Sequence, residues 1–197
     1  MGSLIVFEGI DGTGKSTACR LAAEALRRKG LAVEVTAEPT HEGIGAFIRS
    51  GAAGRISQRA ESLLFTADRW EHTEAMRKSV SEGKVVLCDR YYASTAAYQS
   101  AKLEGDSADM DWLMSLCEPF VRVPDVVILL DADPAATLER VGVRGEAESK
   151  FENLPFLTQV RAAYLDLAER YGYEVVDASR PADDVLSDVL QIIHEVL

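Results

Sequence analysis

The chain has 197 residues, of which 27% are charged and 47% are hydrophobic, a balance typical of soluble globular proteins. This length predicts one domain, residues 1–197, with enough sequence to bury a core. The formal net charge of -11 argues against a nucleic-acid partner, because a protein that binds nucleic acid needs a basic face. A small anionic ligand would have to be held by locally clustered Lys and Arg side chains.

No apolar run approaches the length of a membrane span, and the first run, Leu4–Phe7, is too short for a signal peptide. The three cysteines, Cys19, Cys88 and Cys117, are scattered along the chain and odd in number. This spacing indicates reduced, buried thiols rather than a disulfide frame or a metal site. We therefore expect a cytoplasmic protein with no membrane partner.

Short apolar runs alternate with helical patterns along the chain. The runs expected to form strands are Leu4–Phe7, Ala32–Thr36, Val85–Cys88, Val126–Leu130 and Glu174–Val176. The segments expected to form helices are Lys15–Lys29, Ser57–Glu82, Pro134–Val141 and Ala182–Leu197. The runs VVLC and VVILL are apolar at successive positions, which suits strands covered on both faces. This order predicts an α/β fold of three layers, with a five-stranded parallel sheet flanked by helices.

The segment GIDGTGKS follows the first predicted strand and opens the first predicted helix, and it matches the P-loop pattern. Its glycines let backbone N–H groups turn inward around anionic oxygens, and the helix N-terminus adds partial positive charge. Lys15 would contact the β and γ phosphates of a nucleoside triphosphate, and the Ser16 hydroxyl would bind Mg²⁺. The residues expected to hold the nucleotide here are Gly9, Ile10, Asp11, Gly12, Thr13, Gly14, Lys15, Ser16 and Thr17.

The helix expected over Ser57–Glu82 places Phe65 and Arg69 four residues apart on one face. An aromatic ring that stacks on a base and a guanidinium that bonds a base carbonyl form a sensible recognition pair. A core Phe beside a surface Arg would produce the same pattern, and this motif alone favours that alternative.

The third predicted strand ends at Asp89 and Arg90. Ligands of open parallel sheets bind at the carboxyl ends of the strands, so Asp89 should face the same crevice as Ser16 and help to hold Mg²⁺. Arg90 can clamp a phosphate through two N–H groups, although a structural ion pair is the alternative. The helix after this pair places Ser94, Thr95, Tyr98 and Gln99 where they can meet a base and a sugar, or form an ordinary helix surface.

Read in order, these segments resemble the thymidylate kinase family over nearly the whole chain. The similar segments are FEGIDGTGKST (P-loop), EPT, FTADR, DRYYASTAAYQ, PDVVILLD, RVGVRGEAESKFE (the LID) and VVDASRP. The resemblance implies a P-loop kinase fold and the reaction ATP + dTMP → ADP + dTDP, with Mg²⁺. It also implies a homodimer, for which the apolar residues of the Ser57–Glu82 helix, including Leu63, Leu64, Ala67 and Trp70, are candidates.

The resemblance also assigns residues to the acceptor dTMP. Phe65 would stack on thymine, Arg69 would bond thymine O4, and Tyr98 would crowd the sugar 2′ position. Arg90, helped by Arg49, would hold the acceptor phosphate. The full acceptor set implied is Asp11, Pro39, Arg49, Phe65, Arg69, Arg90, Ser94, Thr95, Tyr98 and Glu152. On the donor side, Arg140 and Arg180 would flank the adenine of ATP.

Two positions depart from the family pattern. Members carry a transfer-assisting arginine either in the P-loop or in the LID, and here the P-loop position is Gly12. The LID, expected at about residues 142–153, must therefore supply the cation; Arg144 is the first choice, with Arg140 and Lys150 as alternatives. Ala37 stands where many members have arginine, and Arg49 is the candidate to replace that charge.

Three rival functions are compatible with parts of this pattern. One is a kinase for another monophosphate or for a free deoxynucleoside, in which Glu38 would serve as the base. Another is a nucleotide-binding switch protein, although the Asn-Lys-x-Asp guanine motif is missing and the acceptor-side arginines would have no role. The third is an inactive relative, against which the intact Lys15, Asp89 and Arg90 argue.

Overall fold

The computed structural model describes residues 2–52, 56–101, 108–143 and 153–197. These residues form one five-stranded parallel sheet with the strand order β2-β3-β1-β4-β5. The strands are β1 (Ser3–Glu8), β2 (Val33–Ala37), β3 (Val85–Asp89), β4 (Val126–Asp131) and β5 (Glu174–Asp177). All five predicted strands are confirmed, with ends that shift by no more than one residue.

The four helices predicted by range are also present, together with four further helices among the described residues. The predicted ones are α1 (Lys15–Arg28), α3 (Gln58–Ser81), α6 (Pro134–Val143) and α8 (Ala182–Val196). The helix expected around Ser94–Gln99 is α4 (Tyr92–Ser100). The remaining helices, whose bounds the sequence did not reveal, are α2 (Gly43–Arg49), α5 (Met110–Cys117) and α7 (Leu154–Tyr171).

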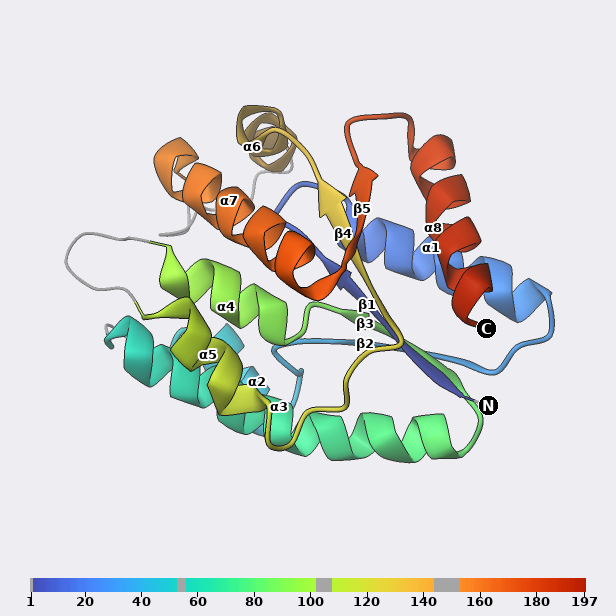
Figure 1. Ribbon diagram of the computed structural model, residues 1–197, viewed down its shortest axis with the longest axis horizontal. Helices are drawn as coiled ribbons and strands as arrows, with labels where there is room; N and C mark the ends of the chain where they lie inside the picture. Colours follow the sequence, from blue (N-terminus) through green and yellow to red (C-terminus); the bar gives the residue numbers. More distant parts are fainter. Residues whose placement is uncertain (1, 53–55, 102–107, 144–152) are drawn as a thin grey trace.

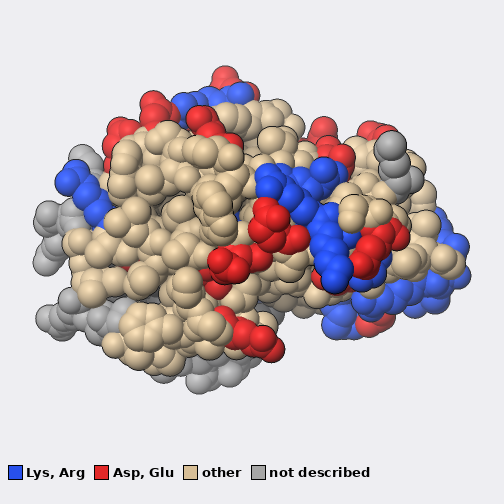
Figure 2. All heavy atoms as spheres, turned by 90° about the horizontal axis from the view of Figure 1, so that it is seen from below, with Lys and Arg blue, Asp and Glu red and all other residues tan. Residues whose placement is uncertain are grey.

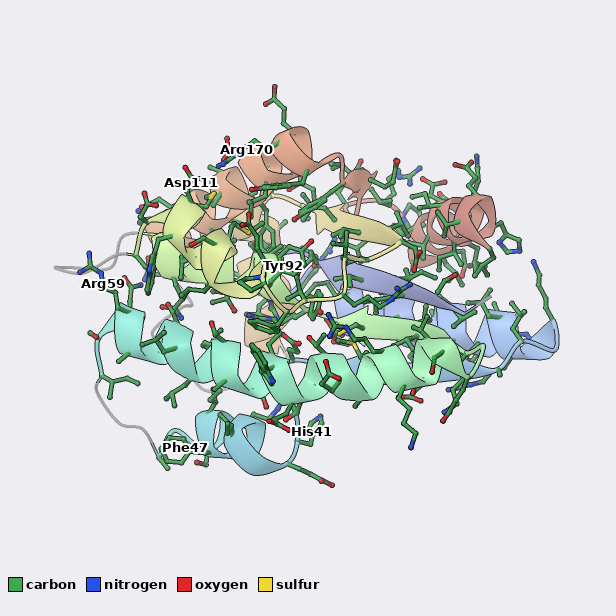
Figure 3. All side chains as sticks on the ribbon, turned by 60° about the horizontal axis from the view of Figure 1, so that its bottom comes forward. His41, Phe47, Arg59, Tyr92, Asp111 and Arg170 are labelled. Carbon is green, nitrogen blue, oxygen red and sulfur yellow. The ribbon has the colours of Figure 1, made fainter. Side chains whose placement is uncertain are left out.

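The sheet is the middle layer of the three-layer architecture that the sequence predicts (Figure 1). Side chains of β1 alternate between its faces: Ile5 and Phe7 pack with α1 and α8, and Leu4 and Val6 pack with α4, α5 and α7. An ion pair of 2.5 Å between Arg170 and Asp111 joins α7 to α5 on the second face (Figure 3). Two hydrophobic cores therefore pack against the opposite faces of the sheet.

The three cysteines Cys19, Cys88 and Cys117 are buried and unpaired, as the sequence predicts. In the described part of the chain, no helix has both the length and the apolar character needed to cross a lipid bilayer.

The carboxyl ends of β1, β2 and β3 meet at one edge of the sheet. In the sheet register Phe7 lies opposite Asp89, and Asp89 lies opposite Ala37. The loops that leave these strands therefore begin side by side. This alignment brings together the P-loop after β1, the Glu38–Thr40 loop after β2 and Arg90 after β3.

Candidate functional site

The P-loop lies at the N-terminus of α1, with its lysine turned back over the loop. The Lys15 Nζ donates to the Ile10 carbonyl at 2.7 Å, and the side chain is buried. Burial and the nearby charge of Arg90 lower the pKa of Lys15 to about 8. Gly12 approaches α6 so closely that a Cβ atom would lie 2.5 Å from the Thr137 carbonyl oxygen. This contact leaves no room for the arginine that some family members carry at that position.

Ser16 and Asp89 meet as predicted. The Ser16 hydroxyl donates to Asp89 Oδ2 at 2.5 Å. The second carboxylate oxygen, Oδ1, is buried and has no hydrogen-bond partner among the residues that the structure describes. A hydroxyl and a carboxylate are the oxygen donors that Mg²⁺ prefers, and an unsatisfied buried oxygen fits a position that faces an ion or its water.

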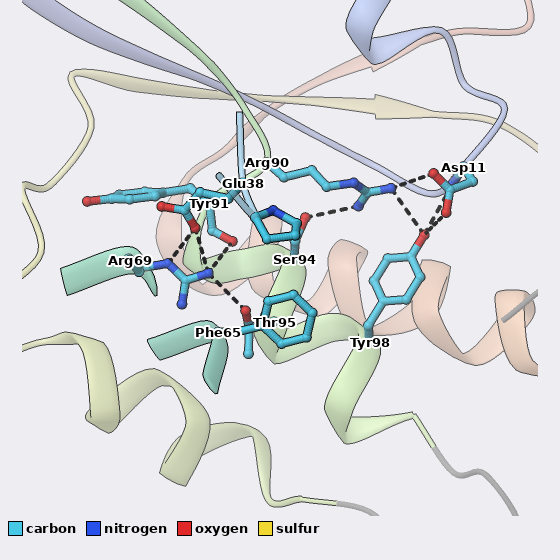
Figure 4. A pocket seen from close by; sticks show the side chains of 10 residues that line it. Asp11, Glu38, Phe65, Arg69, Arg90, Tyr91, Ser94, Thr95 and Tyr98 are labelled. Atoms are coloured by element: carbon cyan, nitrogen blue, oxygen red, sulfur yellow. Dashed lines mark hydrogen bonds and ion pairs between the residues drawn. The ribbon is translucent and has the colours of Figure 1, made fainter. Parts of the chain in front are cut away.

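Beside this pair lies a cavity of about 170 Å³ (Figure 4). Its lining residues are Asp11, Glu38, Pro39, Phe65, Arg69, Arg90, Tyr91, Ser94, Thr95 and Tyr98. Eight of these belong to the acceptor set expected from the sequence, and they come from the P-loop, the loop after β2, α3, the end of β3 and α4. The two arginines lie at opposite ends of the cavity, with Phe65 between them (Figure 4).

Arg90 and Asp11 form one end of the cavity. Arg90 Nη2 contacts Asp11 Oδ1 at 2.6 Å, and the Tyr98 hydroxyl donates to Asp11 Oδ2 at 3.1 Å. Partial desolvation opposes ionisation of Asp11, whose side chain is still 55% exposed, but the charges of Arg90 and Lys15 outweigh it and lower its pKa to about 2. This end of the cavity therefore carries a fixed guanidinium whose counter-ion is a carboxylate.

Arg69 forms the other end and is almost fully enclosed. Its side chain is 1% exposed, with Nε donating to Glu38 Oε2 at 2.8 Å and Nη2 donating to Thr95 Oγ1 at 2.9 Å. Nη2 also donates to the Tyr91 carbonyl at 3.2 Å, and Nη1 donates to Cys117 Sγ at 3.4 Å. The alternative of a core Phe beside a surface Arg is wrong, because Arg69 is buried and Phe65 lines the cavity.

A buried chain of polar groups holds Glu38 in place, and sequence reasoning missed it. His72 Nδ1 lies 2.9 Å from Glu38 Oε1, and His72 Nε2 lies 2.6 Å from the Thr36 hydroxyl. Asp68 accepts hydrogen bonds from the backbone N–H and the hydroxyl of Thr40, at 2.8 and 2.6 Å. Helix α3 therefore fixes the loop after β2, and both oxygens of Glu38 are engaged by side chains of α3.

A larger cavity of about 320 Å³ lies on the other side of the P-loop. Its lining includes Gly12, Thr13, Gly14 and Thr17 of the loop and α1, together with Arg140 and Arg180. Arg140 Nη1 donates to the Ala178 carbonyl at 3.2 Å, while Arg180 pairs with Asp188. The two arginines expected near adenine thus flank one opening beside the P-loop.

Arg49 and the start of the LID differ from what the sequence predicts. Arg49 does not line the acceptor cavity; its Nε donates to the Pro39 and Thr40 carbonyls at 2.8 and 3.1 Å. The LID was expected from residue 142, but residues 142 and 143 belong to α6. Arg144, Lys150 and Glu152 lie outside the described residues.

The parallel sheet of order β2-β3-β1-β4-β5, the P-loop between β1 and α1, and two cavities that meet at this loop define the class of protein: a P-loop kinase-like phosphotransferase. The thymidylate kinase family model matches residues 7–189. A probable thymidylate kinase of Thermococcus onnurineus is 41% identical over 207 residues, covering 98% of both chains. The thymidylate kinase of Ruegeria pomeroyi is 40% identical over 202 residues, covering 98% of this chain and 94% of its own. The chain belongs to the thymidylate kinase family, whose reaction transfers a phosphoryl group from ATP to dTMP.

Proposed function

We propose that this chain transfers the γ-phosphate of ATP to dTMP, giving ADP and dTDP. Family membership supports the reaction. The structural observation that carries the proposal is the cavity with Arg90 at one end, Arg69 at the other and Phe65 between them (Figure 4). A nucleoside monophosphate has the matching layout, with an anion at one end and a flat base with carbonyl oxygens at the other.

In this proposal, Arg90 holds the acceptor phosphate, and Asp11 is the carboxylate that the phosphate replaces or joins. Phe65 stacks on thymine, and Arg69 directs an N–H toward O4. Tyr98 stands beside the sugar, held by its hydroxyl bond to Asp11. Pro39, Ser94 and Thr95 complete the wall, and all of them line the cavity. Glu152 and Arg49 keep the acceptor-side roles that the family resemblance implies, and for Arg49 this requires release from the Pro39 and Thr40 carbonyls.

The donor would lie on the P-loop, with Lys15 at its β and γ phosphates and adenine in the larger cavity between Arg140 and Arg180. Ser16 and Asp89 would hold Mg²⁺ through one hydroxyl and one carboxylate. Bound there, Mg²⁺ would neutralise negative charge on the donor phosphate oxygens. Among the described residues no cluster of three or more acidic, His or Cys side chains could hold an ion, so the remaining ligands would be phosphate oxygens and water.

The reaction needs little proton chemistry, because the acceptor is already an anion near neutral pH. Its barrier comes from the repulsion between two phosphate groups, and positively charged groups lower it. Lys15 acts from the donor side and Arg90 from the acceptor side. Arg144 remains our choice for the cation that closes over the transferring group, since Gly12 has no space for a side chain.

We further propose that the protein is a homodimer built on α3. Leu63, Ala67 and Trp70 recur at positions i, i+4 and i+7 of this helix and are exposed, with Leu63 and Trp70 at 52% and 53%. Phe47 of α2 is a further exposed aromatic (Figure 3). Figure 2, which looks onto the side of α3, shows a broad area without charged groups. Light scattering should give twice the chain mass for the native protein and the chain mass for Leu63→Glu; a monomeric native protein would contradict this assembly.

The rival function, phosphorylation of a free deoxynucleoside, requires a base for the sugar hydroxyl. The candidate Glu38 is instead engaged by Arg69 at 2.7 Å and His72 at 2.9 Å. An assay of ADP release across dTMP, dUMP, UMP, thymidine and no acceptor separates these functions. We expect dTMP to give the highest rate. Thymidine turnover at the dTMP rate would support the nucleoside kinase, and turnover without acceptor would support a nucleotide switch.

A further inference from the structure

Glu8 is a fully buried carboxylate that lines neither the acceptor cavity nor the cavity beside Arg140 and Arg180. It is the last residue of β1, and its exposed fraction is 0%. Glu8 lies two residues after Val6, so it points to the same face of the sheet as Val6, toward α4 and α7. Burying a carboxylate costs free energy unless hydrogen-bond donors surround it. The donors around Glu8 therefore indicate its role.

The first oxygen of Glu8 binds the start of α4. Glu8 Oε1 accepts from the backbone N–H groups of Tyr91 and Ser94, at 2.9 and 3.2 Å. The N-cap residue of α4 is Tyr91, which makes no capping hydrogen bond of its own with its side chain. Helix α4 follows β3 in the chain, but its N-terminus is capped by Glu8, which belongs to β1.

The capping bonds sit next to an unusual backbone conformation at Arg90. Arg90 has φ of 72°, the left-handed region that side-chain-bearing residues rarely adopt. Its backbone N–H donates to the Phe7 carbonyl at 2.9 Å, and the next N–H, that of Tyr91, donates to the Glu8 side chain. The consecutive backbone N–H groups of Arg90 and Tyr91 are thus both bonded to the end of β1. These two bonds fix the direction in which the Arg90 side chain leaves the backbone.

The second oxygen of Glu8 orients two hydroxyl groups. Glu8 Oε2 accepts from the Ser94 hydroxyl at 2.6 Å and from the Tyr164 hydroxyl at 3.0 Å. Arg90 Nη1 in turn donates to Ser94 Oγ at 3.0 Å and to the Tyr164 oxygen at 3.4 Å. The Ser94 and Tyr164 oxygens also lie 2.8 Å apart, so one hydroxyl can donate to the other. An ionised carboxylate can only accept and a guanidinium can only donate, so the hydroxyl protons point to Glu8 or to each other, and oxygen lone pairs are left facing the guanidinium.

We infer that Glu8 is a positioning residue for the acceptor phosphate: through the start of α4 and through the hydroxyls of Ser94 and Tyr164, it sets the backbone and the guanidinium of Arg90. Burial raises the pKa of Glu8, while the Ser94 hydroxyl and the charge of Arg90 oppose this rise. Two backbone N–H groups and two hydroxyls converge on the two oxygens of Glu8, which is the arrangement that an accepting carboxylate fits.

The conservative variant Glu8→Gln tests this inference, because glutamine keeps the size of the side chain but adds an N–H₂ group. Whichever way the amide is turned, a donor then faces either the two backbone N–H groups or the two hydroxyls. In the second case the hydroxyl protons turn toward Arg90. We expect the guanidinium of Arg90 to lose its fixed position, while Phe65 and Arg69 keep theirs because both belong to α3 and Arg69 is held by Glu38.

The measurement is the affinity of each variant for dTMP and for thymidine by titration calorimetry, together with the melting temperature. Since the two ligands differ only in the phosphate, the ratio of their affinities reports on Arg90. We expect Glu8→Gln to weaken the binding of dTMP at least tenfold and the binding of thymidine less than twofold. Tyr164→Phe, which removes one of the two hydroxyls, should have a smaller effect in the same direction. Glu24→Gln, an exposed carboxylate on α1, is the matched control and should leave both affinities unchanged.

The outcomes separate this inference from the proposed function on which it rests. If the native protein bound dTMP no better than thymidine, the proposed function itself would fail. If the native protein favoured dTMP and Glu8→Gln kept the same ratio, the inference about Glu8 would be wrong while the function stands. Equal weakening of both ligands with a lower melting temperature would likewise overturn it, because Glu8 would then only stabilise the fold.

Discussion

The two ends of the acceptor cavity each carry an arginine, but Arg69 is fully buried and Arg90 is only partly buried. At the base end, Arg69 and Glu38 are 1% and 3% exposed, and Arg69 has partners on Glu38, Thr95, Tyr91 and Cys117. At the phosphate end, Arg90 is 18% exposed and its counter-ion Asp11 is 55% exposed. Arg69 therefore has its charge balanced inside the protein, whereas Arg90 is balanced by a group that solvent, and a competing phosphate, can reach.

The difference matches what each end must recognise. A base carbonyl carries only a partial charge, so a neutralised guanidinium with a fixed N–H direction suits it, and the geometry selects the ligand. A phosphate carries a full negative charge, so an arginine that keeps positive potential toward solvent suits it. The base end is a rigid part of the fold. At the phosphate end Arg90 is held in position, but its exposed counter-ion Asp11 can be replaced by a ligand.

Removal of Arg90 should give the largest effect on catalysis. Arg90→Met deletes the acceptor-side cation, and we expect kcat/KM for dTMP to fall by about 10³-fold, in line with the loss of a charged group that stabilises the transition state. Thymidine binding should change little, because the base end is on a different element. Steady-state kinetics and calorimetry measure both; a kcat/KM within fivefold of native would place the phosphate elsewhere.

Removal of Arg69 should instead damage the fold as well as the ligand site. Arg69→Met leaves Glu38 buried without its ionic partner, and we expect a loss of about 3 to 5 kcal/mol in the free energy of unfolding. The double variant Glu38→Gln/Arg69→Met removes the stranded charge and should regain part of that stability, without regaining dTMP affinity. Urea unfolding checks this. Equal stability of the single and double variants would show that the pair does not behave as a buried ion pair.

Binding of the donor ATP at the P-loop, beside the phosphate end of the acceptor cavity, should also respond to pH. The pKa of Lys15 is lowered to about 8, so the free protein loses this charge as pH rises through that value and keeps it below. We expect the Kd for ATP to rise about tenfold between pH 7 and pH 9. Lys15→Arg, which stays charged over this range, should not show this rise. An ATP affinity of the native protein that is flat over the range would contradict the assignment.

The smallest effect should come from the outer end of the polar chain behind Arg69. Thr36→Val removes the hydroxyl that contacts His72 Nε2 and should cost about 1 kcal/mol of stability. Because the ion pair between Glu38 and Arg69 stays intact in this variant, KM for dTMP should change less than twofold. Thermal unfolding and kinetics measure the two quantities. A large rise in KM with normal stability would mean that the base end is less rigid than its burial indicates.

The sequence predicts the strands and the P-loop well because their signals are local. An apolar run such as Val85–Cys88 and the pattern GIDGTGKS both lie within a few consecutive residues. The eight predicted acceptor residues that line the cavity were found from helical spacing and from family resemblance. Helix α7 was missed although its signals are ordinary: Asn153 caps its first turn, and Gly172 ends it with φ of 69°.

Other features depend on partners far away in the sequence. Nothing near Glu8 in the chain indicates that it caps a helix that starts at Tyr92, and nothing near His72 indicates Glu38 as its partner. The burial of Arg69 likewise follows from the packing of α3 against the loop after β2. The side chain of Arg49, expected at the phosphate, binds the Pro39 carbonyl because α2 folds back onto that loop.

A crystal structure of the protein with dTMP tests the central claim most directly, because the claim concerns the orientation of one ligand in one cavity. We predict the phosphate within hydrogen-bond distance of the Arg90 guanidinium, the thymine ring against Phe65 and its O4 facing Arg69. A thymine ring at the Arg90 end, or dTMP bound in the larger cavity between Arg140 and Arg180, would contradict the account.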